Sequence, residues 1–257
     1  MKKFYFLNVL ILLLLCSCKQ QPNYVLSNYA LLQVNDSITY VQEFEKFIKP
    51  YRDSLESFMN REIGVNEVEI KSYKPDSPLS GFMADIMLQK GRNYLISINE
   101  TNSNLPSIAI INTGGIRNAF KKGVVTVRTI YEIMPFENTL VALLMKGEDI
   151  EELFEHLARV NGDGLSGVTC DLTPTGMKNI IIDSDNFDSE KNYWVFVPDY
   201  LAEGGSGYFV FNKVLKKIES NIKIRDIVIE YINNEKTIHY IHNTRINDTR
   251  NEKNSYD

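Results

Sequence analysis

The stretch PSIAIINTGGIR, residues 106–117, decides which fold the chain can form. Its first half is a short β-branched run bounded by turn residues, which predicts a buried strand. Asn112 and the paired glycines Gly114 and Gly115 then break the strand, and such glycines let a backbone approach a ligand closely. Arg117 adds a planar guanidinium that matches phosphate or carboxylate oxygens. Taken alone, the segment is better explained as an ordinary turn followed by a surface charge.

The residues on either side show helical and strand patterns. Residues 38–60 repeat apolar side chains at steps of three and four, which predicts one apolar helical face, and Pro50 must kink or split that helix. Gly147 to Val160 is the clearest helix, because carboxylates fill its first turn and an apolar stripe follows. Further helices are predicted at 79–91, ended by Gly91, and at 130–133; strands are predicted at 63–70, 106–111, 124–127, 139–145, 167–173, 178–183 and 193–198. Residues 224–233 fit a helix or a strand. Antiparallel hairpins late in such a mixed chain predict the α+β class.

The first residues have the layout of an exported lipoprotein. A short cationic start precedes an apolar run over residues 4–15, which is typical of a secretory signal and shorter than the ~20 residues of a membrane-spanning helix. Small residues before a cysteine are typical of the bacterial lipoprotein processing site. Residues 1–17 are therefore predicted to be a signal peptide and Cys18 the lipidated residue. Cys16 fits this site poorly because leucines precede it, and a cleaved signal with incidental cysteines is the alternative.

The predicted anchor sets an expected location. We expect the mature protein to be exported and held in the bacterial cell envelope by its lipid. Lys19, directly after the lipidated cysteine, favours the outer membrane over the inner membrane. Residues 18–35 are polar and turn-rich, so they are expected to tether the folded domain to the membrane.

Charge and cysteine content argue against two other functions, nucleic-acid binding and thiol catalysis. Removing residues 1–17 takes two lysines from 28 basic residues, which leaves 26 against 33 acidic residues and a net charge of about −7. An acidic chain without a basic stripe is a poor candidate for binding nucleic acid. Cys170 lies in an alternating strand pattern and is predicted to pack there, not to act as a catalytic thiol.

Two further turns each present an aromatic side chain. Residues 134–139 form a proline-fixed turn that carries Phe136, and residues 199–208 form a glycine-rich turn that carries Tyr200. Either ring could belong to the core. Two rings on separate turns could equally clamp a flat ligand, since stacking on a base contributes about 1–3 kcal/mol per ring.

Taken in this order, the segments resemble the C-terminal, substrate-binding domain of the 5′-nucleotidase family. That family has an Asn-x-Gly-Gly-Ile-Arg strand end, a Pro-Phe-x-Asn-Thr turn and a Leu-Ala-x-Gly-Gly-x-Gly-aromatic turn, and all three occur here. Residues 76–85 are a degraded copy of its upstream Glu-Ser-x-Leu-Gly-Asn-Leu-x-Ala-Asp helix. The resemblance covers residues 36–235 and implies one α+β domain with a mixed, largely antiparallel sheet. Residues 236–257 would then be a polar tail, which is expected to be frayed.

The resemblance implies a role for each motif. Phe136 and Tyr200 correspond to the two rings that sandwich the base. Asn112 and Arg117, with the two glycines between them, correspond to the contacts with the nucleotide, and Arg117 is expected to bind its phosphate. The chain should therefore bind a nucleotide or nucleoside.

Two departures from the family pattern affect this site. Ser206 stands where the family usually has an aspartate that binds the ribose hydroxyls, and serine lacks the charge and the second acceptor oxygen. An arginine that the family places before the upstream helix is missing, and only Lys71 and Lys74 lie near. A lysine meets a phosphate as a point charge, without the bidentate fork.

The family's catalytic chemistry has no counterpart in this sequence. A two-metal phosphatase site needs several His, Asp and Asn ligands. The three histidines are His156, expected on the exposed side of its helix, and His239 and His242 in the tail. The aspartates of residues 183–188 resemble part of a calcium loop, but they lack its glycine and bidentate glutamate and are predicted to form a solvated turn. No catalytic residue, metal ligand or cofactor is assigned to this chain.

Two functions fit these observations. The chain is either the substrate-recognition half of a split 5′-nucleotidase or a non-catalytic nucleotide-binding lipoprotein. In the first case a separate exported chain supplies the metallophosphatase domain with its divalent metals. Survival of the Asn112–Arg117 segment and both ring turns favours the first, whereas Ser206 and the missing arginine favour the second.

Overall fold

The computed structural model describes residues 35, 39 and 41–250. The predicted signal peptide, Cys18 and nearly all of the predicted tether lie outside these residues. Within them, no helix combines the length and the apolar character needed to cross a membrane. The chain divides into two compact units at Lys49 and Pro50, and helix α2 (Gln42–Met59) spans the division. The helix predicted at 38–60 thus forms without a split at Pro50, and none of its side chains is buried.

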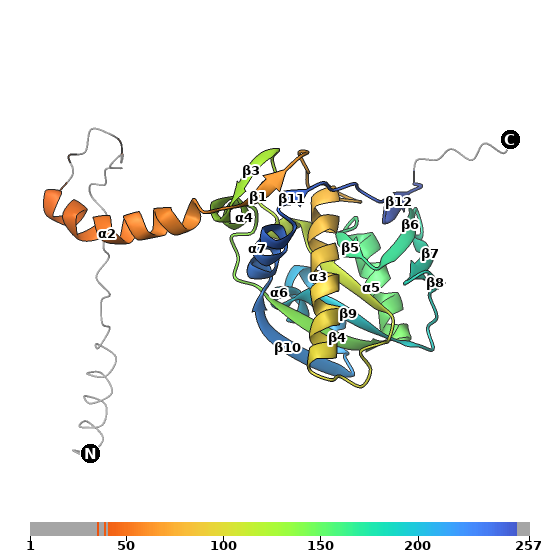
Figure 1. The fold of residues 1–257 in the computed structure, drawn as a ribbon. Helices are drawn as coiled ribbons and strands as arrows, with labels where there is room; N and C mark the ends of the chain where they lie inside the picture. The colour runs from red at the N-terminus through yellow and green to blue at the C-terminus, as the bar shows by residue number, and fades with distance from the viewer. Residues whose placement is uncertain (1–34, 36–38, 40, 251–257) are drawn as a thin grey trace, which may run out of the picture. The chain divides into compact units, whose positions relative to one another are not determined.

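The second unit is built on a five-stranded sheet with the strand order β10-β4-β9-β2-β5 (Figure 1). Its strands are β2 (Ser107–Ile111), β4 (Thr139–Lys146), β5 (Gly164–Ser166), β9 (Asn192–Pro198) and β10 (Lys216–Lys223). Only β2 and β9 run parallel; the other three pairs are antiparallel. All five residues of β2 are buried, as the β-branched run predicts.

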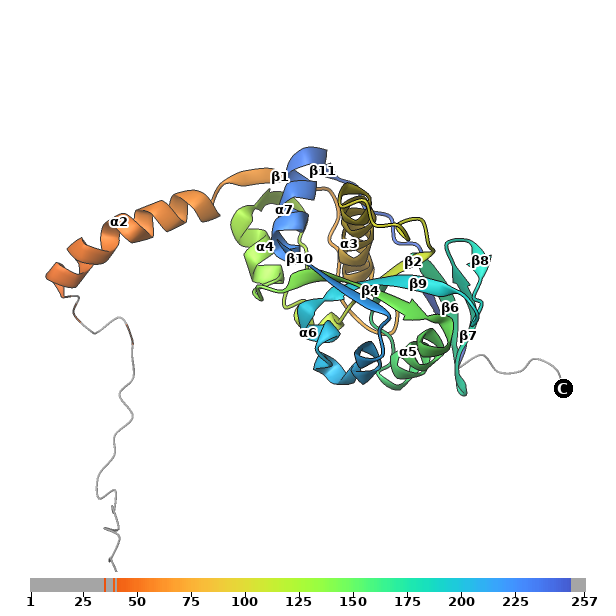
Figure 2. The ribbon, with the colours of Figure 1, turned by 90° about the horizontal axis from the view of Figure 1, so that it is seen from below.

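Helices cover both faces of this sheet, as Figure 2 shows. One face carries α3 (Pro78–Ser97), α4 (Val127–Ile133) and α7 (Ile224–Glu235), and the other carries α5 (Gly147–Arg159) and α6 (Asp199–Ala202). Because successive strand residues point to opposite faces, Ala109 and Ile111 join the core beneath α3, while Ile108 and Ile110 join the core beneath α5. Two covered faces explain why the central strands β2, β4 and β9 carry long apolar runs.

Two smaller sheets flank the central one. The first has the order β11-β1-β3, and the second has the order β12-β6-β7-β8. Their strands are β1 (Glu62–Asn66), β3 (Gly123–Thr126), β6 (Val168–Thr173), β7 (Gly176–Ile182), β8 (Asp185–Asn186), β11 (Thr237–Ile238) and β12 (Ile246–Asp248). The α+β class with a mixed, largely antiparallel sheet is therefore confirmed.

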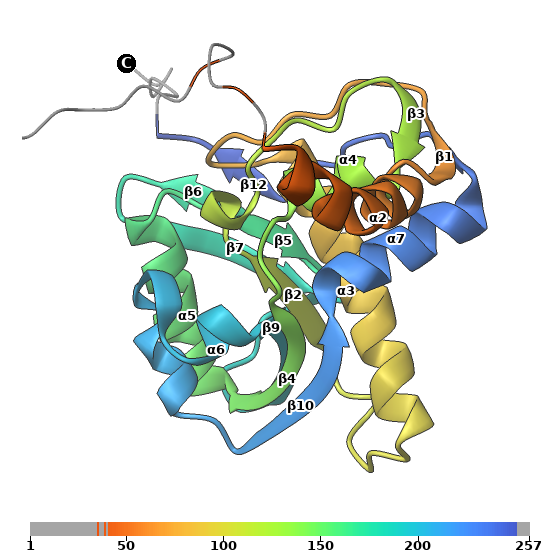
Figure 3. The same cartoon turned by 90° about the vertical axis from the view of Figure 1, so that its left-hand side faces the viewer.

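The C-terminal segment contradicts the expectation of a frayed tail. β11 pairs with β1 and β12 pairs with β6, both in parallel, and Figure 3 shows β12 lying beside β6. Arg245 also donates from Nη2 to both carboxylate oxygens of Asp85, at 3.0 and 2.7 Å. The prediction failed because short parallel strands gain their partners from distant sequence, which a local polar composition does not reveal.

Helix α3 also differs from its predicted bounds. Ser77 caps it, since the Ser77 hydroxyl accepts from the Ser80 N–H at 3.1 Å, and Pro78 occupies the first turn. The helix does not end at Gly91 but continues to Ser97. A Cβ atom at Gly91 would lie 2.3 Å from the Phe196 ring, so this glycine permits close packing of the helix on the sheet.

Cys170 is a buried residue of β6, as predicted. Burial raises the pKa of its thiol to about 12. An unfolded thiol ionises near pH 9.0, so between these two values the folded chain binds more protons than the unfolded chain. The contribution of this thiol to the free energy of unfolding is therefore fully present below about pH 9. That contribution is lost as the pH rises toward 12.

We expect Cys170 to be chemically silent in the folded protein. With Cys16 and Cys18 changed to serine, Cys170 is the one remaining thiol. Ellman's reagent at pH 8 should react with it only after denaturant is added, because burial shields the thiol from the reagent and its raised pKa leaves almost no thiolate. Prompt reaction in the native protein would contradict its burial.

Candidate functional site

The first predicted segment leaves the central sheet at the end of β2. Asn112 follows the last strand residue, Ile111, and precedes a 3-10 turn, η1 (Thr113–Gly115). Neither Gly114 nor Gly115 has a positive φ angle. A Cβ atom at Gly115 would instead lie 3.3 Å from the Asn112 carboxamide oxygen. Close approach, not unusual backbone geometry, is thus the local reason for Gly115.

The second segment is the turn between α4 and β4, and it holds Phe136, a residue that is 44% exposed. Its neighbour Glu137 accepts from Lys223 at 2.9 Å and from Arg225 at 3.0 Å. Lys223 first, and then Arg225, lowers the pKa of Glu137. The buried Arg225 guanidinium also lies 3.7 Å from the Tyr131 ring centre. These contacts fix the turn that presents the Phe136 ring.

The third segment consists of α6 and a second 3-10 turn, η2 (Gly205–Gly207). Tyr200 is 48% exposed, and its hydroxyl accepts from the Ser206 N–H at 3.2 Å. Ser206 adopts a positive φ of 54°. A Cβ atom at Gly205 would lie 2.6 Å from the Tyr200 ring and 2.3 Å from its carbonyl oxygen, so only glycine fits there.

The three segments meet around one pocket of about 460 Å³. Its lining consists of Asn112, Gly114, Gly115, Arg117, Phe136, Asn138, Tyr200 and Ser206. All seven residues predicted to bind substrate therefore lie together, although they come from three distant parts of the sequence. The guanidinium carbon of Arg117 lies 5.2 Å from the Phe136 ring centre. Asn138 is an additional lining residue, which its place in the Phe136 turn could have indicated.

A buried carboxylate that the sequence did not single out joins the first and third of these segments. Asp163 follows α5, and its side chain is 3% exposed. It accepts from the Thr113 N–H at 2.9 Å and from the Tyr208 hydroxyl at 2.7 Å, and Lys74 Nζ lies 3.0 Å away. Burial, followed by the Asp163 charge, raises the pKa of Tyr208 well above its usual value. A charged residue flanked by glycines, directly before a buried strand, was the available signal.

Neither lysine near the missing arginine lines the pocket. Lys74 is bound to Asp163 and also donates to the Val160 carbonyl at 2.8 Å. Lys71 pairs with Glu69 at 3.2 Å on the surface. Among the pocket's lining residues, all of them in the described part of the chain, Arg117 alone carries a positive charge.

The predicted surface position of His156 is wrong. The residue is buried, and its ring centre lies 4.2 Å from that of Tyr208, beneath the third segment. Burial is the first cause that lowers the pKa of His156. A Cβ atom at Gly207, in η2, would lie 3.2 Å from the His156 ring, so this turn covers the histidine.

The aspartates of residues 183–188 also differ from a purely solvated turn. Asp183 accepts from the Ser107 N–H at 2.9 Å and forms an ion pair with Arg92.

The two histidines near the C-terminus each contact a carboxylate. His239 pairs with Glu67 and His242 with Asp76, each at 2.7 Å. Over residues 35, 39 and 41–250, no group of three or more His, Cys, Asp or Glu side chains could hold a metal ion.

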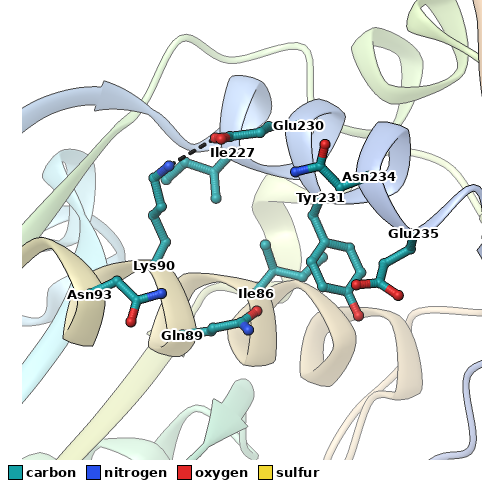
Figure 4. A pocket seen from close by; sticks show the side chains of 9 residues that line it. All are labelled: Ile86, Gln89, Lys90, Asn93, Ile227, Glu230, Tyr231, Asn234 and Glu235. Carbon is teal, nitrogen blue, oxygen red and sulfur yellow. Dashed lines mark hydrogen bonds and ion pairs between the residues drawn. The ribbon is translucent and has the colours of Figure 1, made fainter.

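A second depression lies between α3 and α7 and measures about 210 Å³ (Figure 4). Lys90 reaches across it to Glu230 at 2.8 Å, and the rest of the lining mixes amide and carboxylate side chains with Ile86, Ile227 and Tyr231. None of the three motifs contributes a residue to it. The pocket between Phe136 and Tyr200 is therefore the candidate site.

The α+β fold and the three motif turns around one pocket together define the class of this domain. A family model described as "5'-nucleotidase, C-terminal domain" matches residues 62–213, which is more than half of the chain. The chain belongs to this family.

Individual relatives agree with that assignment. The chain is 27% identical over 208 residues to the trifunctional nucleotide phosphoesterase protein YfkN of Bacillus subtilis, which covers 73% of this chain and 14% of that protein. It is 30% identical over 151 residues to a snake venom 5′-nucleotidase of Naja atra, covering 49% of this chain and 27% of the relative. A 5′-nucleotidase precursor from Thermus thermophilus has the same fold, with a TM-score of 0.69 and 23% identity over 81% of this chain and 43% of its own. The chain thus spans less than half the length of these relatives.

Removing the Asp163 carboxylate should loosen the whole site. In Asp163→Ala the Thr113 N–H and the Tyr208 hydroxyl lose their buried acceptor, so the free energy of unfolding should fall by roughly 3 kcal/mol. Chemical denaturation measures this change. Asp185→Ala, at an exposed position, is the matched control and should cost less than ~0.5 kcal/mol. Equal, small losses in both variants would show that Asp163 does not hold the segments.

Proposed function

We propose that this chain is the nucleotide- or nucleoside-recognition component of a 5′-nucleotidase-type phosphohydrolase, acting in nucleotide breakdown in the cell envelope. The observation that carries the proposal is the convergence of all seven predicted residues on one pocket. The base stacks on Phe136 and Tyr200, which are about half exposed and so are available to a ligand.

The polar lining supplies the remaining contacts. The carboxamides of Asn112 and Asn138 offer donors and acceptors to a base edge or a sugar. Arg117 binds the phosphate, since its planar fork matches two phosphate oxygens. This guanidinium lies 5.2 Å from the Phe136 ring centre, which holds the charge beside the pocket.

The hydrolytic step belongs to a second chain in this proposal. That chain carries the metallophosphatase domain and its divalent metals, which activate the attacking water. The support is that all seven predicted substrate-binding residues line one pocket, as a working recognition site requires. The chain shown here binds substrate and orients its phosphate toward the partner.

The proposed location follows from the N-terminal sequence. We propose that residues 1–17 direct export and that a lipid on Cys18 anchors the protein. The outer membrane is favoured over the inner membrane as the site of this anchor. Tethering both chains in one envelope layer would raise their effective concentration and favour pairing.

A second candidate function is a nucleotide-binding lipoprotein without a catalytic partner. The observations that favour it are Ser206 in the lining and the engagement of Lys74 by Asp163, which leaves one cation for phosphate.

Stacking on both rings can be tested by truncation. Phe136→Ala and Tyr200→Ala should each weaken nucleoside binding by about 1–3 kcal/mol, or about 5- to 150-fold in Kd. Isothermal titration calorimetry with a nucleoside series measures this loss. Phe209→Ala is the control, because that ring is 69% exposed and does not line the pocket. Unchanged affinity in both pocket variants would remove the stacking proposal.

The split-enzyme proposal has its own test. Phosphate release from AMP should be absent with the purified chain alone and should rise when an exported metallophosphatase chain and Mn²⁺ are added. Asp163→Ala in place of the wild-type chain should reduce that gain. If the partner's activity is indifferent to this chain, the binding-lipoprotein function is favoured instead.

A further inference from the structure

The pocket contains a positive charge but no negative one. Across the described residues, its lining offers two carboxamides, two hydroxyls, Phe136, two glycines and Arg117, and none of these is a carboxylate. A ribose presents two neighbouring hydroxyl donors. An ionised acceptor binds such donors through charge-assisted hydrogen bonds, which are roughly twice as strong as neutral ones. The two sugar hydroxyls therefore meet only neutral acceptors here.

Three carboxylates close to these segments are engaged elsewhere, and the exposed Glu203 of the third segment does not line the pocket. Asp163 is buried and has three partners. Asp199 accepts from the Thr139 hydroxyl at 2.9 Å and from the Tyr200 N–H at 2.7 Å. Glu137 is bound to a lysine and an arginine. Turning any of them toward a sugar would break existing charge-assisted or capping bonds.

Ser206 is the side chain best placed to contact the sugar in place of these carboxylates. It stands at the tip of η2, its N–H is bound to the Tyr200 hydroxyl, and its neighbour Gly205 packs on the Tyr200 ring. A ligand stacked on Tyr200 would hence have its sugar beside this turn. A single hydroxyl can bond to one sugar oxygen, but it lacks the paired acceptor oxygens that engage two at once.

We propose that this pocket selects its ligand by base and phosphate and does not read the 2′-hydroxyl. Its ligand class accordingly includes 2′-deoxyribonucleosides and their monophosphates on equal terms with the ribose compounds. This inference rests on the proposed binding of nucleosides between Phe136 and Tyr200. It adds that the sugar-facing residue, Ser206, sets tolerance toward the sugar.

The test compares matched ligand pairs by calorimetry on the full chain. Ribonucleosides and 2′-deoxyribonucleosides of adenine, guanine, cytosine and uracil are titrated, and the affinity ratio is taken for the base that binds most tightly. The wild-type ratio should lie within about twofold. Ser206→Asp should shift it about tenfold toward the ribonucleoside, because a carboxylate then meets both hydroxyls. Ser206→Asn introduces a neutral side chain of about the size of aspartate, so it should leave the affinity ratio near one.

Both variants suit the backbone, since aspartate and asparagine are enriched at positive φ. A wild-type preference of tenfold or more for ribonucleosides would overturn the inference, as would an unchanged ratio in Ser206→Asp. If no nucleoside binds, or if binding ignores Phe136→Ala, the proposed function itself fails. A sugar preference that still depends on Phe136 would sink only the inference.

Discussion

The candidate site depends on the hydrogen bonds and the ion pair that the buried carboxylate of Asp163 forms. It accepts from Thr113 in the first segment and from Tyr208 at the end of the third, and it pairs with Lys74 ahead of α3. A buried charge is tolerated only when it is paired and hydrogen-bonded, so these partners are held in place by the cost of losing them. The pocket is consequently built before a ligand arrives, which reduces the ordering cost of binding.

The sheet beneath the site supplies the second constraint. Helices pack on both of its faces, so the strands that meet the pocket are buried along most of their length. β2 leads into the Asn112 segment, β4 follows the Phe136 turn, and β9 leads into the Tyr200 turn. These three strands are neighbours in the order β4-β9-β2, and this adjacency brings the three motifs together.

Much of this could be predicted because the signals are local. A short β-branched run marked β2, periodicity marked α5, and the order of three short motifs indicated the family and the residues of the pocket. Other features depend on distant partners. Asp163 looks like part of an Asn-Gly-Asp-Gly turn until Tyr208 and Lys74 are brought to it. The short strands near Ile238 and Ile246 gain their identity only from β1 and β6, so a polar composition suggested a frayed tail.

The central claim is that a nucleoside base lies between Phe136 and Tyr200. The most direct measurement is a crystal structure of the chain with its tightest-binding nucleoside. The account predicts the base stacked on both rings, with Asn112 or Asn138 at its polar edge and the sugar beside Ser206. A nucleoside bound elsewhere, with both rings left uncovered at saturating concentration, would contradict it.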